Sequence, residues 1–111
     1  MCTRQQVWAE KAYAKVKAVE NTIGEEDYGR FCKGFPALIH SAGLCQAVAF
    51  AEAKEKDKYL EDLAAVLGKN KDDLAHTSRL VDVVEYQQLS RDAMAVATWL
   101  KRYAEALLKG R

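Results

Sequence analysis

The sequence predicts an all-α protein, in which residues 1–111 form a single compact helical domain of about five to seven helices, with long first and last helices. Three observations lead to this prediction. The 111 residues include one proline and six glycines, apolar residues recur at helical spacing along most of the chain, and capping residues precede several of these stretches. Half of the residues are hydrophobic and 30% are charged, which is typical of globular proteins.

The first helix has the clearest start signal. Thr3 and Gln6 stand three residues apart and match a capping box. The stretch that follows predicts one buried stripe, made of Trp8, Ala12, Val16, Val19 and Ile23. Gly24 is expected to end this helix.

Two short helices are expected over residues 25–43. Three acidic residues at 25–27 suit the positive N-terminus of a helix, whose buried side would hold Tyr28, Phe31, Cys32 and Phe35. Pro36 is expected at the first position of a separate third helix, where its missing N–H costs nothing. Gly43 is expected to end that helix in a left-handed conformation.

The middle of the chain predicts three more segments. Residues 44–53 are almost continuously apolar, and their alanines favour a buried central helix over a strand. Asp57 is expected to cap a helix that ends near Gly68, with an inner face of Tyr59, Leu60, Leu63, Val66 and Leu67. After a turn at 69–71, Asp72 and Asp73 are expected to cap a segment that contains Leu74, Leu80, Val81 and Val84.

The last helix is expected to begin at a Ser90 cap and to run through Lys109. Its apolar face comprises Ala93, Val96, Ala97, Leu100, Tyr103, Ala104 and Leu107. Trp99 lies at the edge of this stripe, so it is either a half-buried core residue or a protein contact.

Composition excludes several classes of protein. The net charge of +1 means that any contact with nucleic acid depends on cations gathered on one face. No apolar run approaches the ~18 residues of a membrane span, and the N-terminus lacks the pattern of a signal peptide, so we expect a cytoplasmic protein. The three cysteines are widely spaced and contain no Cys-x-x-Cys pair, so Cys32 and Cys45 are expected to be free thiols in the core.

No constellation of catalytic residues is recognisable. The two histidines, His40 and His76, lack metal-ligand spacing, and neither a nucleophile elbow nor a glycine-rich phosphate loop is present. The acidic residues at 25–27, 61–62 and 72–73 are expected at helix starts or on outer faces. We therefore expect no catalytic residue, no metal and no cofactor, although a small helical nuclease with an inward carboxylate cluster stays open as an alternative.

Basic residues are arranged along helix faces. One sector of the first helix carries Arg4, Lys11 and Lys15 beside Trp8, and Arg30 and Lys33 stand three apart further on. The outer side of the last helix carries Arg91, Arg102 and Lys109, with Lys101 at its margin. Two long terminal helices are expected to be neighbours, so these cations could form one surface that follows an RNA backbone. A solvated polar face would explain the same pattern.

Three stretches, taken in order, resemble the small-subunit family of the type III-B CRISPR–Cas (Cmr) effector complexes. They are Thr-Arg-Gln-Gln-Val-Trp-Ala-Glu at 3–10, the segment from Tyr28-Gly29-Arg30 to Gln46-Ala47, and the segments at 89–93 and 99–106. Residues 40–42 depart from the basic residue expected before the glycine turn, so no RNA contact is assigned there.

The resemblance implies a helical, non-catalytic subunit that stacks in several copies beside backbone subunits. Its implied partners are CRISPR RNA and target RNA within the complex, neighbouring small subunits, and the backbone and large subunits. RNA contact is then expected through Arg4, Lys11, Lys15, Arg30, Lys33, Arg91, Lys101 and Arg102. The alternative is a purely structural scaffold whose basic faces meet acidic protein surfaces.

Overall fold

The computed structural model describes residues 3–80 and 82–108, which form six helices and no strand. The helices are α1 (Arg4–Val19), α2 (Glu25–Ala42), α3 (Leu44–Ala53), α4 (Asp57–Val66), α5 (Lys71–Leu80) and α6 (Val83–Leu107). The predicted all-α bundle with long first and last helices is confirmed. Its radius of gyration of 13.1 Å is that of a compact domain of this length.

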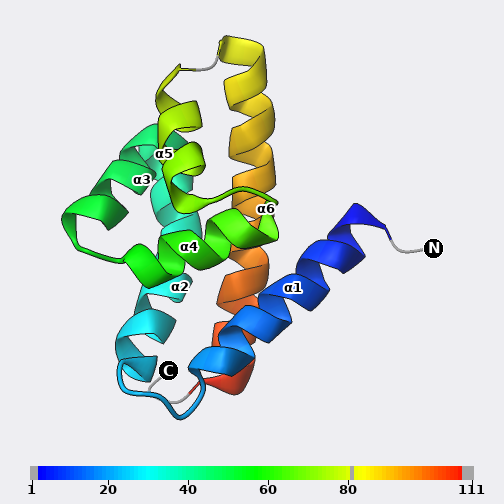
Figure 1. Ribbon diagram of the computed structural model, residues 1–111, viewed down its shortest axis with the longest axis vertical. Helices are drawn as coiled ribbons and strands as arrows, with labels where there is room; N and C mark the ends of the chain where they lie inside the picture. Colours follow the sequence, from blue (N-terminus) through cyan, green and yellow to red (C-terminus); the bar gives the residue numbers. More distant parts are fainter. Residues whose placement is uncertain (1–2, 81, 109–111) are drawn as a thin grey trace.

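The longest helix, α6, is the axis of the fold (Figure 1). It packs mainly against α2 and α1, and α1 crosses its C-terminal half diagonally. The shorter helices α3, α4 and α5 pack on one another and complete the core. The predicted contact between the two terminal helices is therefore confirmed. Among the described residues, no helix combines the length and apolar character that crossing a membrane requires.

The start of α1 forms as the sequence predicts. The Thr3 hydroxyl accepts the Gln6 N–H at 3.1 Å, and the Gln6 side chain accepts the Thr3 N–H at 2.7 Å. Four of the five stripe residues are buried: Trp8, Ala12, Val16 and Val19. The prediction for the fifth residue, Ile23, is wrong, because the helix ends at Val19 and leaves this side chain fully exposed in the following turn.

A single helix, α2, replaces the two short ones that were predicted, and Pro36 lies inside it. A proline there removes the N–H that would bind the Cys32 carbonyl and costs about 3 kcal/mol in a helix interior. Burial of Phe35 and Ile39 on either side of it, at 1% and 4% exposure, offsets that cost. The φ of +89° at Gly43 agrees with a glycine helix end, but its ψ of 159° lies outside the left-handed helical region that was expected.

The predicted helix at 44–53 is present, but it is half-buried rather than central. One side packs in the core through Leu44, Ala47, Val48 and Ala51, while Phe50 is 43% exposed. Cys45 is likewise only partly buried, whereas Cys32 is fully buried as expected.

The helix starts at α4 and α5 differ slightly from the prediction. Lys56, and not Asp57, is the N-cap of α4. The Asn70 side chain caps α5 by accepting the Asp73 N–H at 2.8 Å, so the two aspartates occupy its first turn. The predicted inner face of α4 is confirmed, with Leu67 half-buried at its end.

The last helix begins seven residues before the predicted Ser90 cap. Asp82 is its N-cap and accepts the Glu85 N–H at 2.9 Å, an arrangement as favourable as a serine cap. Leu80 and Val84, which were predicted to share one segment, belong to α5 and α6 respectively and are 67% and 74% exposed. Val81 and Lys109 lie outside the described residues. The predicted apolar face is buried at Ala93, Val96, Ala97, Leu100 and Ala104, with Tyr103 and Leu107 half-buried.

Candidate nucleic-acid interface

The predicted cations of α1 divide into one that is used within the fold and two that are free of ion pairs. The Arg4 guanidinium lies 4.6 Å from the centre of the Trp8 ring and forms an ion pair with Asp92 of α6. Lys11 is exposed and Lys15 is half-buried, and neither has an ion-pair partner within residues 3–80 and 82–108. Arg4 therefore holds α1 against α6, while the two lysines remain available to a partner.

The outer side of α6 carries three of the predicted cations. Arg91 is exposed and donates to the Gln88 side chain at 3.2 Å. The Arg102 side chain is 66% exposed and lies 4.0 Å from the Glu105 carboxylate, which is a weak solvent-exposed pair. Lys101 is half-buried and has no ion pair in the described part of the chain.

The α1–α6 contact shows how these two sets of cations are placed. The Trp99 indole donates to the Gln5 side chain at 2.8 Å, and Tyr13 meets Tyr103 edge-on at 5.4 Å between ring centres. Trp99 also stacks on Tyr103 at 5.8 Å, so it is a half-buried residue of the helix contact.

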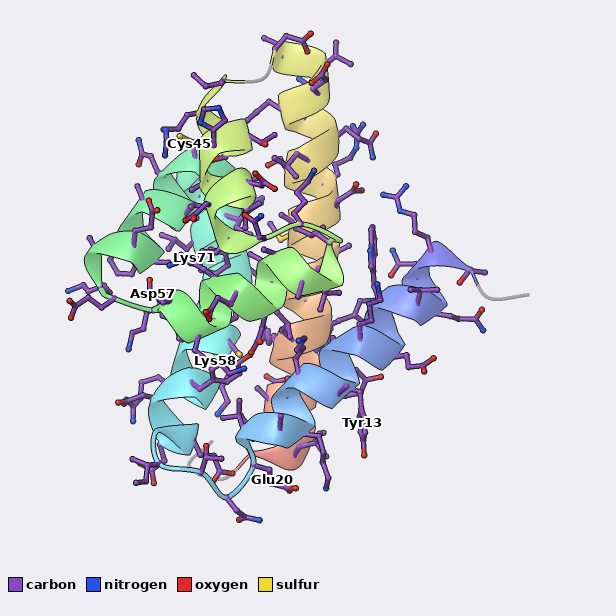
Figure 2. The ribbon with its side chains drawn as sticks, viewed as in Figure 1. Tyr13, Glu20, Cys45, Asp57, Lys58 and Lys71 are labelled. Atoms are coloured by element: carbon purple, nitrogen blue, oxygen red, sulfur yellow. The ribbon has the colours of Figure 1, made fainter. Side chains whose placement is uncertain are left out.

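Tyr13 identifies the flank of α1 that meets the C-terminal part of α6 (Figure 2). Lys11 and Lys15 each stand two residues from Tyr13, which is about 160° around the helix axis. The groove that contains Arg102 is walled on α1 by Gln5, which stands about 80° around the helix axis from both Tyr13 and Lys15. The two lysines therefore lie on the side of α1 away from Tyr13, and a single surface that they share with Arg102 stays a prediction.

The two predicted cations of α2 differ in their surroundings. Arg30 is exposed and forms an ion pair with Asp27 at 2.9 Å. Lys33 is half-buried and has no ion-pair partner in the described ranges. Next to it, burial raises the pKa of the Cys32 thiol well above its usual range, so this cysteine is neutral.

One carboxylate, that of Asp62, contradicts the prediction that the acidic residues lie at helix starts or on outer faces. Asp62 is 2% exposed, accepts the Tyr28 hydroxyl, and forms an ion pair with Lys58 at 3.0 Å. Glu25 is also buried, at 8% exposure, but it lies at the start of α2 as predicted. Sequence could not indicate the burial of Asp62, since Tyr28 lies 34 residues away in the chain.

This buried carboxylate does not assemble a reactive centre. The Asp62 carboxylate already accepts a hydrogen bond from Tyr28 and pairs with Lys58, and burial raises the pKa of Tyr28 far above its usual range. Within 3–80 and 82–108, no three histidine, cysteine or acidic side chains lie close enough together to hold a metal ion. His40 and His76 are exposed on α2 and α5. The Tyr28–Asp62–Lys58 cluster therefore joins α2 to α4 and has the features of a structural contact.

The sequence profile of the CRISPR-associated protein family Cas_Cmr5 matches residues 4–107, which is nearly the whole chain. This chain belongs to the Cas_Cmr5 family. A curated relative from Thermus thermophilus, the CRISPR system Cmr subunit Cmr5, is 39% identical over 113 residues, covering 98% of this chain and 99% of the relative.

The fold agrees with this family membership. The crystal structure of a CRISPR-associated Cmr5 family protein from Thermus thermophilus superposes with a TM-score of 0.93 at 38% identity, covering 97% of this chain and 100% of that one. The match runs through all six helices described above, so the family fold positions the cations on α1, α2 and α6.

Proposed function

We propose that this chain is the non-catalytic small subunit of a type III-B CRISPR RNA-guided antiviral effector complex in the cytoplasm. In this role it stacks in several copies in a filament and lines the groove that holds target RNA. The observation that carries the proposal is the end-to-end similarity to a Cmr subunit, which spans 98% of this chain and 99% of the relative. The family resemblance therefore rests on the whole helical domain and not on one shared segment.

The proposed RNA contacts are the exposed or half-buried cations that the fold leaves without strong partners. Lys11 and Lys15 on α1 form one candidate set, and Arg91 and Arg102 on α6 form the other. Arg30 and Lys33 on α2 and Lys101 on α6 are further candidates. Among the cations predicted to contact RNA, Arg4 is the least suited to do so, since its guanidinium already binds Asp92.

The isolated chain should bind single-stranded RNA weakly, since its net charge is +1 and only two or three of these cations share a face. Each neutralised phosphate contributes about −0.7 to the slope of log affinity against log salt for single strands. The purified chain should not cleave RNA or DNA with Mg²⁺, Mn²⁺ or Zn²⁺ present. Cleavage abolished by changing one carboxylate or histidine would instead support the nuclease alternative.

The two candidate faces are tested separately in reconstituted complexes. We compare Lys11→Glu/Lys15→Glu with Arg91→Glu/Arg102→Glu and measure target-RNA affinity at several salt concentrations. The face that contacts RNA should lose affinity similarly for unrelated sequences, because phosphates carry no sequence information, and its salt slope should fall by about 1.4 for two lost contacts.

A matched control is Lys69→Glu/Arg79→Glu, which reverses two exposed cations outside both faces. If both test variants assemble normally and bind with unchanged affinity and slope, the RNA wall lies elsewhere. If a test variant fails to assemble while the control assembles, that face meets protein, which is the scaffold alternative.

A further inference from the structure

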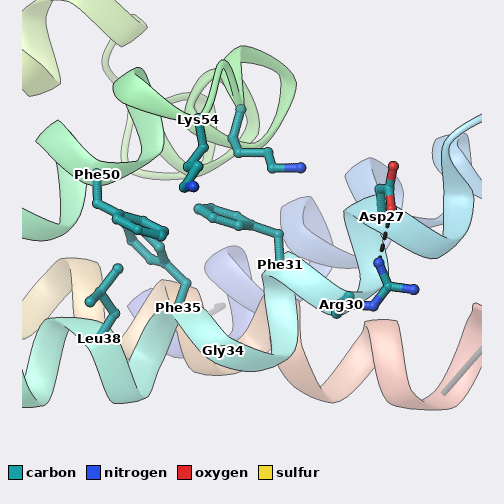
Figure 3. Close-up of a pocket in the computed structure, with 9 residues that line it drawn as sticks. Asp27, Arg30, Phe31, Gly34, Phe35, Leu38, Phe50 and Lys54 are labelled. Carbon is teal, nitrogen blue, oxygen red and sulfur yellow. Dashed lines mark hydrogen bonds and ion pairs between the residues drawn. The ribbon is translucent and has the colours of Figure 1, made fainter.

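A groove with an apolar floor and a cationic rim lies between α2 and the α3–α4 connection (Figure 3). Its volume is about 370 Å³. Phe31, Leu38 and Phe50 form the floor, and Arg30, Lys54 and Lys56 stand around it. Phe50 is 43% exposed, so the floor is open to solvent. A side chain added at Gly34, in the wall of the groove, would meet nothing within 4 Å, so the centre of the groove has room for an occupant.

The residues that line the groove indicate what kind of side chain would bind there. The Lys54 and Lys56 ammonium groups each lie 5.7 Å from the centre of a floor ring, Phe50 and Phe31 respectively. The rim contains one carboxylate, Asp27, which is paired with Arg30 at 2.9 Å. Three cations and one carboxylate leave a positive rim around apolar rings. The fitting occupant is therefore an apolar side chain flanked by acidic residues.

The same chain presents such a feature at the start of α6. Asp82, Val83, Val84 and Glu85, here called the acidic tip, are all exposed, and the two valines are 70% and 74% exposed. The Asp82 carboxylate also caps the helix by accepting the Glu85 N–H, which fixes this carboxyl group beside the valines. Ile23 is exposed too, but it lines the hollow next to the groove and is a single apolar side chain.

We propose that the groove of one copy of this chain receives the acidic tip of a second copy. The inference rests on the proposed function as a repeated subunit, and it names the two faces that meet. Groove and tip are different surfaces, so the contact is heterologous and repeats head-to-tail into an open row of copies. The valines would cover the exposed rings, and the carboxyl groups of Asp82 and Glu85 would meet the lysines of the rim.

A cysteine trap tests this contact inside the reconstituted complex. Lys54→Cys and Val84→Cys are introduced together in a chain whose Cys2 and Cys45 are replaced by serine; Cys32 is buried and stays. Mild oxidation should link small subunits into dimers and longer ladders. The control pair Lys69→Cys/Val84→Cys places the first thiol outside the groove and should give few links.

The outcomes separate this inference from the proposed function. Equal yields from test and control pairs, or no disulfide while a lysine cross-linker still joins small subunits, would overturn the groove–tip contact and leave the stacking intact. Absence of any link between small subunits would refute the stacking as well.

A charge exchange distinguishes a protein occupant from RNA. Lys54→Glu/Lys56→Glu and Asp82→Asn/Glu85→Lys should each weaken association between copies roughly tenfold and lower the number of small subunits per complex; asparagine keeps the helix cap. An equal mixture of the two variants should restore that number, since each altered surface then has a complementary one. If the groove variant weakens only RNA capture and the tip variant changes nothing, the groove binds RNA and the inference is wrong.

Discussion

Replacing Asp62 by alanine should be the most damaging single change in the cluster that joins α2 to α4. Asp62 is 2% exposed and accepts the hydroxyl of Tyr28, which is itself 8% exposed. Loss of the carboxylate leaves that buried hydroxyl without its acceptor, at a cost of about 1–3 kcal/mol. The Lys58 side chain is 58% exposed, so its pairing adds at most about 1 kcal/mol.

The expected loss for Asp62→Ala is therefore about 1–4 kcal/mol, a large share of the roughly 5–15 kcal/mol typical of a domain. Asp62→Asn keeps an acceptor for Tyr28 and should cost about 1 kcal/mol. Lys58→Met should cost less than about 1 kcal/mol. Tyr28→Phe removes the bond to a charged acceptor and should cost about 2 kcal/mol.

Urea unfolding followed by circular dichroism measures these free energies, and an unchanged m-value shows that the native state stays compact. The double variant Tyr28→Phe/Asp62→Ala should cost at least about 1 kcal/mol less than the sum of its single changes, because the two groups share one interaction. Additive single changes, or a Lys58→Met loss as large as that of Asp62→Ala, would refute the account of this cluster.

Three further predictions concern single positions. In a variant whose N-terminal cysteine is replaced by serine, iodoacetamide at pH 8 should modify Cys45 and spare Cys32 in the native protein, because burial raises the pKa of the Cys32 thiol. Mass spectrometry of the labelled protein measures the two rates of modification, and equal rates would contradict the prediction. Gly43→Ala should destabilise the protein by about 1–3 kcal/mol, since φ is +89° there and the added carbon would lie 3.3 Å from the Tyr86 hydroxyl. Thermal unfolding measures this loss of stability, and an unchanged melting temperature would contradict the prediction. Ile23→Asp should change stability by no more than about 0.5 kcal/mol, because this side chain is fully exposed; a larger loss in urea unfolding would show that Ile23 packs in the core after all.

The sequence predicted on which helix faces the candidate cations lie, but not how these faces are arranged in the fold. Helical periodicity correctly placed Lys11 and Lys15 outside the buried stripe of α1, and Arg91 and Arg102 outside that of α6. The angle at which α1 crosses α6 was not predictable, and that angle decides how Lys11 and Lys15 lie relative to Arg102. The groove on α2 was also missed, since it combines Phe31 with residues from the α3–α4 connection.

The sequence by itself determined the features that depend on neighbours three or four residues apart. The Thr3 capping box and the inner face of α4 are of this kind, because both follow from the pitch of the helix. Tertiary packing decided the rest: whether the helix continues through Pro36, whether Asp62 is buried, and whether Arg4 is free. The hydrogen-bond partners of Asp62 and Arg4 are distant in the chain, 34 residues away for Asp62 and 88 for Arg4. A local pattern does not contain the free energy of such contacts, so only the folded chain shows which cations are left for a partner.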